Sequence, residues 1–203
     1  MSEFARALLL MLVLLNPFLV IIYLLDVVEK LDKIHFARVL WRGCLIAWAV
    51  FSAFTWLGEQ VFANLMQARF ASFQIFGGVV FLLIGVQFVF NGPRAIAVLR
   101  GESENLAGAI AMPVLIGPGT ISASVLVGER VPIWQAILAI GLAVFITYVS
   151  MVLLKMLHDY VRPRREPLVE RYIEIAGRLT ALFVGTISVE MIMQGLRGWT
   201  GAF

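Results

Sequence analysis

The sequence predicts an all-α polytopic membrane protein with six transmembrane helices, arranged as two inverted repeats of three helices each. Composition is the first of three supporting observations, because the 203 residues are 61% hydrophobic and only 14% charged. Soluble domains have roughly 45–50% apolar and about 25% charged residues. The second observation is a set of six apolar runs long enough to cross a membrane. The third is that proline interrupts two of these runs at corresponding positions, about one hundred residues apart.

The six predicted spans each have about 20 residues or more, the length a helix needs to cross ~30 Å of hydrocarbon. Charged connectors separate them, and the long connectors follow the first, third and fifth spans. No stretch remains for a soluble domain, so residues 1–203 are expected to form one membrane domain. The predicted spans are 4–25, 39–62, 70–90, 106–127, 133–157 and 173–199.

The first span contains Asn16-Pro17 in the middle of MLVLLNPFLVIIYLL. Proline lacks a backbone N–H and clashes with the preceding turn, so it interrupts a helix. Asn16 is a good N-cap for a helix that restarts at Pro17. At ~1.5 Å rise per residue the interruption lies roughly 18–20 Å along the span, near the middle of the bilayer.

The second and third spans offer few polar positions. Glu59 lies near the outer end of the second span. In the third span, Gly77 and Gly78 are expected at a helix contact, because small residues let helix backbones approach closely in a membrane.

The fourth span contains the sequence IGPGTIS, from Ile116 to Ser122. Gly117-Pro118-Gly119 is expected to interrupt this helix at the same depth as the first interruption. A restarted helix exposes unpaired N–H groups and the positive end of its dipole, so two such ends can bind an anionic group such as a carboxylate. The predicted substrate-binding residues are Asn16, Pro17, Phe18, Gly117, Pro118, Gly119, Thr120 and Ser122.

The sixth span contains a glutamate, Glu190, seven residues before Arg197. Ionisable residues inside membrane spans are costly and are therefore candidates for function. Glu190 and Glu59 are the predicted carriers of a coupling proton, although a structural role for Glu59 is the simpler interpretation because it lies close to the interface.

The two halves of the chain show a weak internal repeat. A shift of one hundred residues aligns the third span with the sixth and gives identities such as Gly77 with Gly177 and Gly85 with Gly185. Three spans per half place the second half upside down in the membrane, an arrangement common among secondary transporters. The predicted division is repeat one at 1–92, a cytoplasmic connector at 93–104 and repeat two at 105–203.

Lysine and arginine counts predict the orientation. Eleven of the 16 basic residues lie in or beside the three long connectors and four lie on the opposite side. Because cytoplasmic loops carry the excess of Lys and Arg, the long connectors are expected in the cytoplasm and both termini outside. The formal charge of +3 therefore reflects membrane orientation, and no nucleic-acid partner is expected.

Several segments together resemble the MarC-type family of small neutral amino acid transporters. They are LNP in the first span, MPVLIGPGTIS in the fourth, WLGEQVFANL and FGGVVFLLIGVQFVF in the first half, and ISVEMIMQGLRGW near the end. The resemblance implies six spans in two inverted halves, an inner-membrane location, and transport of glycine or alanine coupled to protons. This chain departs from the family's Asn/Asp-Pro-x-Gly-x-x-Pro pattern at Leu19 and Ile22, which makes the first half-site more apolar.

The predicted function is therefore secondary transport of small neutral amino acids or similar solutes by alternating access. Two alternatives stay open: an uncoupled exporter or pore for small solutes, and a non-transporting membrane scaffold or sensor subunit. The expected partners are the solute and the lipid bilayer. No metal or cofactor is expected beyond a coupling proton or sodium ion, and the absence of nucleophile, phosphate-loop and metalloprotease motifs argues against an enzyme.

Overall fold

A computed structural model describes residues 2–17, 20, 21, 24, 28, 31–58, 69–91 and 115–200. Within these ranges every regular element is an α-helix, as the apolar composition predicts. The described helices are α1 (Glu3–Leu15), α4 (Lys33–Leu57), α5 (Phe70–Asn91), α8 (Pro118–Arg130) and α9 (Ile133–Thr200).

Three stretches of the described helices are long and apolar enough to cross a membrane. They are Lys33–Leu57, Phe70–Gln87 and Ile133–Val161. These stretches overlap the predicted second, third and fifth spans. The count of six spans and the inverted repeat stay predictions, because the connector at 93–104 and much of the fourth span lie outside the described residues.

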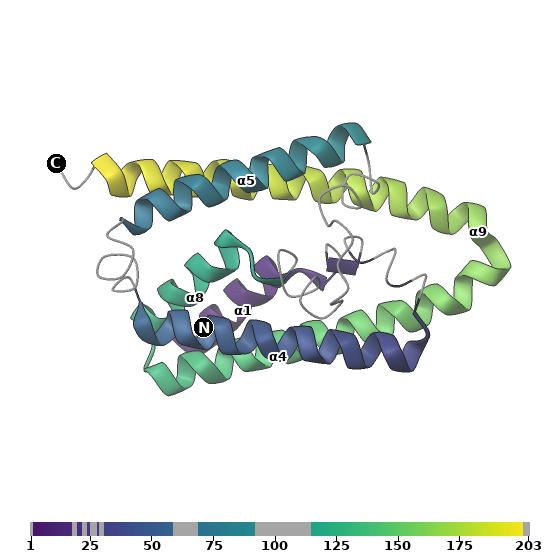
Figure 1. The fold of residues 1–203 in the computed structure, drawn as a ribbon, viewed down its shortest axis with the longest axis horizontal. Coiled ribbons are helices and arrows are strands. Elements are labelled where there is room, and N and C mark those ends of the chain that lie inside the picture. The colour runs from purple at the N-terminus through teal and green to yellow at the C-terminus, as the bar shows by residue number, and fades with distance from the viewer. Residues whose placement is uncertain are drawn as a thin grey trace.

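Helix α9 corrects one expectation, since the segment 158–172 was predicted to be a connector between two spans. The structure instead has one helix of 68 residues that runs through it. Charged side chains end a membrane span without ending a helix, because helical hydrogen bonds join backbone groups only. Pro163 and Pro167 remove two backbone donors midway along α9, and α9 bends back on itself in its middle part (Figure 1).

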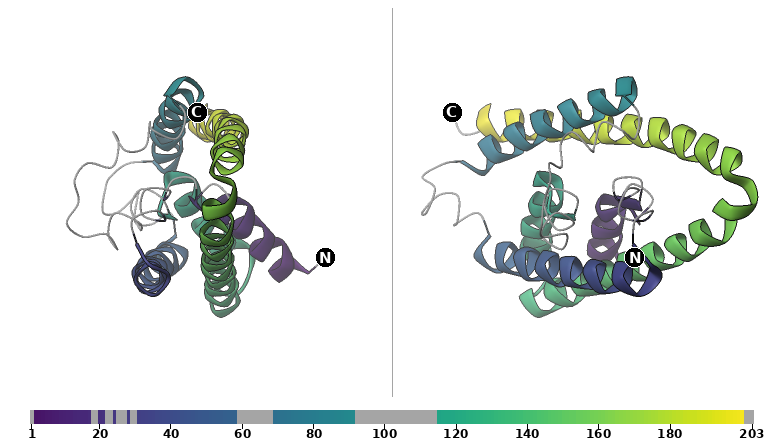
Figure 2. Two further views of the ribbon diagram at one scale, coloured as in Figure 1. Left: turned by 90° about the vertical axis from the view of Figure 1, so that its right-hand side faces the viewer. Right: turned by 45° about the vertical axis from the view of Figure 1, so that its right-hand side comes forward.

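The bend in α9 brings its two halves into different layers of the molecule. The first half lies beside α4, and the second half lies beside α5 (Figure 1). Helices α1 and α8 stand between these two layers, as the right-hand view of Figure 2 shows. Both short helices contact α9, and α8 also contacts α4 and α5.

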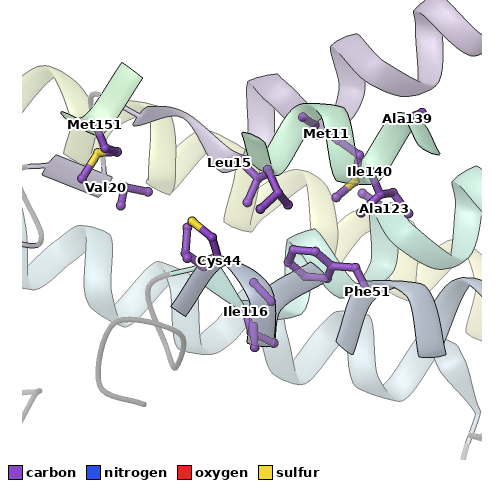
Figure 3. Packing of buried hydrophobic residues seen from close by; sticks show 14 of the residues in the cluster. Met11, Leu15, Val20, Cys44, Phe51, Ile116, Ala123, Ala139, Ile140 and Met151 are labelled. Atoms are coloured by element: carbon purple, nitrogen blue, oxygen red, sulfur yellow. The ribbon is translucent and has the colours of Figure 1, made fainter. Parts of the chain in front are cut away.

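The main apolar core lies among α1, α4, α8 and the first half of α9. Its members include Met11 and Leu15 of α1, Phe51 of α4 and Ile140 of α9, all at most 1% exposed (Figure 3). Thr55 of α4 donates a hydrogen bond of 2.9 Å to the carbonyl of Ser124 in α8. In a membrane such packing contacts and interhelical hydrogen bonds hold helices together, since lipid is as apolar as the side chains.

Glycines allow α5 to lie directly against the second half of α9. A Cβ atom built on Gly78 would lie 2.7 Å from the carbonyl oxygen of Ser188, and one built on Gly195 would lie 2.8 Å from that of Ala71. These distances are too short for a real Cβ, so the two backbones touch only because the side chains are absent. The contacts pair the beginning of α5 with the end of α9, so the two segments are antiparallel.

Candidate functional site

A cavity of about 1110 Å³ lies between the second half of α9 and helices α1, α5 and α8. Its volume is at or above the upper end of the ~300–1,000 Å³ range of ligand pockets. Apolar side chains form most of its wall, and a few polar groups interrupt them. This combination of an apolar wall and a few converging polar groups is typical of a small-molecule site.

Helix α8 supplies one wall of the cavity. Residues three or four apart lie on one face of a helix, and the α8 lining follows this spacing: Gly119, Ser122, Ala123, Leu126 and Glu129. The hydroxyl oxygen of Ser122 is buried and has no hydrogen-bond partner among the described residues.

The second half of α9 supplies the opposite wall, and its lining residues run from Leu182 to Gln194 and include Thr186, Glu190 and Gln194 as polar groups. The side-chain amide of Gln194 donates a hydrogen bond of 3.0 Å to the Glu190 carboxylate. The Thr186 hydroxyl donates to the carbonyl of Leu182, one turn earlier in the helix. The Glu190 carboxylate is thus held in place by a neutral partner.

Helices α5 and α1 complete the enclosure. Gln74, Gly85 and Val89 line it from α5, and Leu10 and Leu14 line it from α1. Gln74 lies close to the level of Gln194, because neighbouring residues 75 and 195 are in contact across the α5–α9 interface. Two amides and a carboxylate therefore occupy the same end of the cavity.

The Gly117-Pro118-Gly119 segment is the start of α8, at the place where the sequence predicts a helix to restart. Gly117 is the N-cap and Pro118 begins the helix. The backbone N–H of Gly117 donates to the Thr120 hydroxyl at 2.9 Å, and that hydroxyl lies 3.0 Å from the carbonyl oxygen of Leu115. Thr120 is 5% exposed, so its hydroxyl closes this turn rather than facing the cavity.

The first predicted interruption has a different local geometry. Helix α1 ends at Leu15, and Asn16 is its C-cap, with its backbone N–H donating to the carbonyl of Leu12. The carbonyl of Asn16 in turn accepts from the N–H of Val20 at 3.1 Å, a helical spacing that resumes after Pro17. Asn16 therefore ends one helical segment in addition to preceding the next.

The structure brings together three of the ten predicted site residues. Gly119, Ser122 and Glu190 line the cavity, whereas Asn16, Pro17, Gly117, Pro118 and Thr120 are absent from its described lining. Phe18 and Glu59 lie outside the described residues.

Sequence reasoning missed other lining residues, among them Glu129, Thr186 and Gln194. Helical spacing is the signal that points to them, since Glu129 follows Ser122 by two turns and Thr186 and Gln194 lie one turn on either side of Glu190. Gly85 and Gly185, which the internal repeat aligns, also line the cavity. A Cβ built on Gly185 would meet nothing within 4 Å.

A second polar cluster lies away from the cavity, in the middle of α9. Lys155 is 4% exposed. Its ammonium donates to the carbonyl of Val28 and, at 2.6 Å, to the carboxylate of Asp159. Lys155 is therefore a buried link between α9 and Val28.

Comparison with known proteins identifies the family. The model of the MarC family of integral membrane proteins matches residues 1–200. The chain is 27% identical to a UPF0056 membrane protein of Methanocaldococcus jannaschii, over 91% of each chain. It is 22% identical to the UPF0056 inner membrane protein YhgN of Escherichia coli K12, over 98% of each chain. No solved structure matches the chain. The match of the family model over nearly the whole length shows that the chain belongs to the MarC family of integral membrane proteins.

Proposed function

We propose that this protein is a secondary transporter of small neutral amino acids or similar small solutes, with the cavity between α1, α5, α8 and α9 as its binding site. One observation carries the proposal: Gly119 and Ser122 of α8 line a single cavity together with Glu190, which is about 70 residues away in the sequence. Polar groups inside a membrane protein are costly and mark solute or ion pathways. Glu190 and the amides of Gln74 and Gln194 add polar groups to an otherwise largely apolar wall.

Alternating access requires two parts of the molecule to move around a fixed site. The arrangement supports this proposal, because the cavity is bounded by α5 and the second half of α9 on one side and by α1 and α8 on the other. The first pair is held together by close backbone contacts. Rocking of this pair against the remaining helices would open the cavity toward one membrane face and then toward the other.

Glu190 is the proposed carrier of the coupling proton. A carboxylate in a largely apolar cavity can take up a proton and release it as the cavity opens to different sides. The amide of Gln194 fixes the carboxylate on the cavity wall. Glu59, the other predicted candidate, lies outside the described residues, and a sodium ion remains the alternative coupling ion.

We propose an inner-membrane location with both termini outside. The length and apolar character of the helices, the family and the name of the Escherichia coli relative, which describes that protein as an inner membrane protein, support the membrane assignment. The distribution of lysine and arginine supports the orientation.

Counterflow of labelled alanine in proteoliposomes, with and without a pH gradient, tests the proposal. Gradient-driven uptake by the wild-type protein is expected, and Glu190→Gln should retain alanine exchange but lose its response to the gradient. Glu3→Gln is a matched control, since Glu3 pairs with Arg6 on the exposed surface of α1 and should leave both unchanged.

Other outcomes would favour the alternatives. Flux through the wild-type protein that does not depend on the pH gradient would indicate an uncoupled exporter or pore. Absence of flux for a broad panel of solutes would instead indicate a scaffold or sensor subunit. An unaltered pH profile in Glu190→Gln would remove Glu190 as the proton carrier.

A further inference from the structure

Helix α9 belongs to both layers of the molecule. Its first half packs on α4, where the indole N–H of Trp48 donates to the carbonyl of Ile137 at 3.3 Å. Its second half packs on α5, where a Cβ built on Gly78 would lie 2.7 Å from the carbonyl oxygen of Ser188. Because α9 is one continuous helix, rocking of one layer against the other requires α9 to bend between these two contacts.

Two prolines lie between the contacts, in the middle part of α9 that bends back on itself (Figure 1). Proline has no backbone N–H, so Pro163 cannot donate to the carbonyl of Asp159 and Pro167 cannot donate to the carbonyl of Pro163. Residues four apart lie on one face of a helix, and the two missing hydrogen bonds therefore follow each other along the same face. Bending that opens this face breaks fewer hydrogen bonds than bending elsewhere in α9.

The place of the prolines along α9 also lowers the cost of bending. The membrane-crossing stretch of the first half ends at Val161, so the carbonyls of Asp159 and Pro163 lie at the edge of the hydrocarbon or beyond it. An unpaired carbonyl is costly inside hydrocarbon, because nothing there donates a hydrogen bond to it. Water at the membrane edge can donate to both carbonyls, so the bend angle can change without loss of a protein hydrogen bond.

A small change at this bend becomes a large displacement at the cavity. Glu190 follows Pro167 by 23 residues, which corresponds to about 35 Å of helix at ~1.5 Å rise per residue. A change of about 5° in the bend would therefore move Glu190 by roughly 3 Å relative to the first half of α9, which is the length of a hydrogen bond. Helix kinks at proline commonly exceed ~20°, so a change of this size is well within what such a bend allows.

We propose that the bend of α9 at Pro163 and Pro167 is the hinge on which α5 and the second half of α9 rock against the rest of the molecule. This inference rests on the proposed function, because it assigns the moving joint of the alternating-access cycle. On one side of the hinge, the close backbone contacts make α5 and α9 move as one body. On the other side, the hydrogen bond from Lys155 to the carbonyl of Val28 holds the first half of α9 in place.

Distances between spin labels in the purified full-length protein test the hinge without any solute. The labels are attached through Trp56→Cys and Phe76→Cys, because both side chains are exposed, while the natural Cys44 is buried. Trp56 is near the end of α4 and Phe76 near the start of α5, and these helix ends lie away from the bend (Figure 1). The wild-type hinge should give a broad distance distribution for this pair.

The double variant Pro163→Ala with Pro167→Ala should narrow that distribution, because alanine restores both backbone donors and favours a regular helix. Pro132→Ala is the matched control, since Pro132 directly precedes α9 and lies outside the bend, and the distribution should stay broad. If the double variant does not fold, Pro163→Ala alone restores one donor and should narrow the distribution in part.

A second label pair, Phe76→Cys with Phe183→Cys, lies within the layer of α5 and the second half of α9 and should give a narrow distribution in every protein. The inference is overturned if the Trp56–Phe76 distribution of the wild-type protein is as narrow as that of this pair. It is also overturned if the Trp56–Phe76 distribution is equally broad in the wild-type protein and the double proline variant.

Flux in proteoliposomes separates the hinge from the transport function. The double proline variant should exchange labelled alanine about tenfold more slowly than the wild-type protein, a factor that corresponds to a barrier higher by about 1.4 kcal/mol, and Pro132→Ala should exchange it at the wild-type rate. Narrowing of the distance distribution together with no flux of any solute in the wild-type protein would show failure of the transport function. Wild-type flux that the double variant retains in full would show failure of the hinge alone.

Discussion

Thr120 is the residue that organises the start of α8. Its hydroxyl accepts from the N–H of Gly117 and lies within hydrogen-bond distance of the carbonyls of Leu115 and Gly117. A helix begins with unsatisfied N–H groups, and here one side chain satisfies backbone groups that no water can reach. The sequence suggested that this hydroxyl faces a solute, but burial assigns it to the backbone.

Thr120→Val should therefore destabilise the protein. Valine has nearly the same shape but leaves the buried N–H of Gly117 unpaired, which costs about 1–3 kcal/mol. A lower melting midpoint in detergent is expected for Thr120→Val, and Thr120→Ser, which keeps the hydroxyl, should melt close to the wild-type protein. Equal melting of all three proteins would show that the hydroxyl makes no net contribution.

Lys155 is the most deeply buried cation among the side chains that the structure describes, and both of its hydrogen-bond partners are within reach of its ammonium. An ammonium in an apolar surrounding is tolerated only when it is paired. The link to the carbonyl of Val28 holds that residue against α9.

Lys155→Met should lower the melting midpoint because it leaves Asp159 and the carbonyl of Val28 without their donor. Loss of one partner of a buried ion pair costs ~3–5 kcal/mol, and the lower end is expected because the Asp159 side chain is 27% exposed. Lys33→Met, an exposed lysine at the start of α4, is the matched control and should melt like the wild-type protein. A midpoint for Lys155→Met equal to that of this control would contradict the role assigned to Lys155.

At the scale of the helices, the contact between α5 and the start of α8 depends on a single glycine. A Cβ built on Gly77 would lie 2.0 Å from the Cβ of Pro118. Neither atom belongs to the flexible end of a side chain, so an added methyl group must push the helices apart. Gly77 therefore positions the first turn of α8 beside the cavity.

Gly77→Ala is expected to destabilise the protein by about 1–3 kcal/mol, the usual cost of overpacking. Gly185→Ala is a useful comparison, since a Cβ at Gly185 would meet nothing within 4 Å. Melting in detergent should show a clear loss for the first variant and little change for the second. Similar melting of the two variants would mean that α5 and α8 are not in this close contact.

The course of α9 shows that hydropathy does not predict where a helix ends. Charged residues between 158 and 172 predicted the end of a span, and hydropathy indeed limits the membrane-crossing stretch to Ile133–Val161. The helix itself continues to Thr200. Hydropathy reports which solvent a segment prefers, whereas helix continuation depends on backbone hydrogen bonds and on whether prolines are accommodated by a bend.

At the scale of the whole molecule, the cavity exists because α1 and α8 hold two helical layers apart. The layer of α5 and the second half of α9 does not form the cavity alone, since it supplies Glu190 whereas Ser122 comes from α8, which stands between the layers. A transporter needs such a site between two parts that can move relative to each other. Occupying the space between them should therefore block function without unfolding either layer.

Gly119→Leu should abolish solute uptake while leaving folded, membrane-inserted protein. Gly119 lines the cavity, and its nearest neighbours around an added Cβ are side-chain atoms of Phe81 and Met191 at 3.2 and 3.3 Å, which can shift slightly. The leucine side chain would then press against Phe81 and Met191, and Met191 also lines the cavity. Uptake into proteoliposomes, together with size-exclusion chromatography of the purified variant, is the measurement, and uptake at the wild-type rate would argue against this cavity as the solute site.

A small part of the candidate site was predicted from the sequence. Gly119 and Ser122 were identified from a helix-breaking motif, and Glu190 from the cost of a charge inside a membrane span. Glu129 was not predicted, because its position two turns after Ser122 indicates a lining residue only when the side of α8 that lines the cavity is known. Asn16 and Pro17 were expected in the same pocket as Gly117 and Pro118, but Leu10 and Leu14 represent α1 in the described lining.

The sequence alone determined that this is a helical membrane protein, because a composition of 61% hydrophobic residues in membrane-length runs leaves few other structures available. It also determined where α8 begins, since proline and glycine act through local backbone geometry. Only the tertiary structure decided which helix faces meet and that α9 continues through its charged segment. It also decided that the Thr120 hydroxyl binds backbone groups, whereas Ser122 lines the cavity. Those outcomes depend on contacts between residues distant in the chain, and local sequence preferences carry no information about such partners.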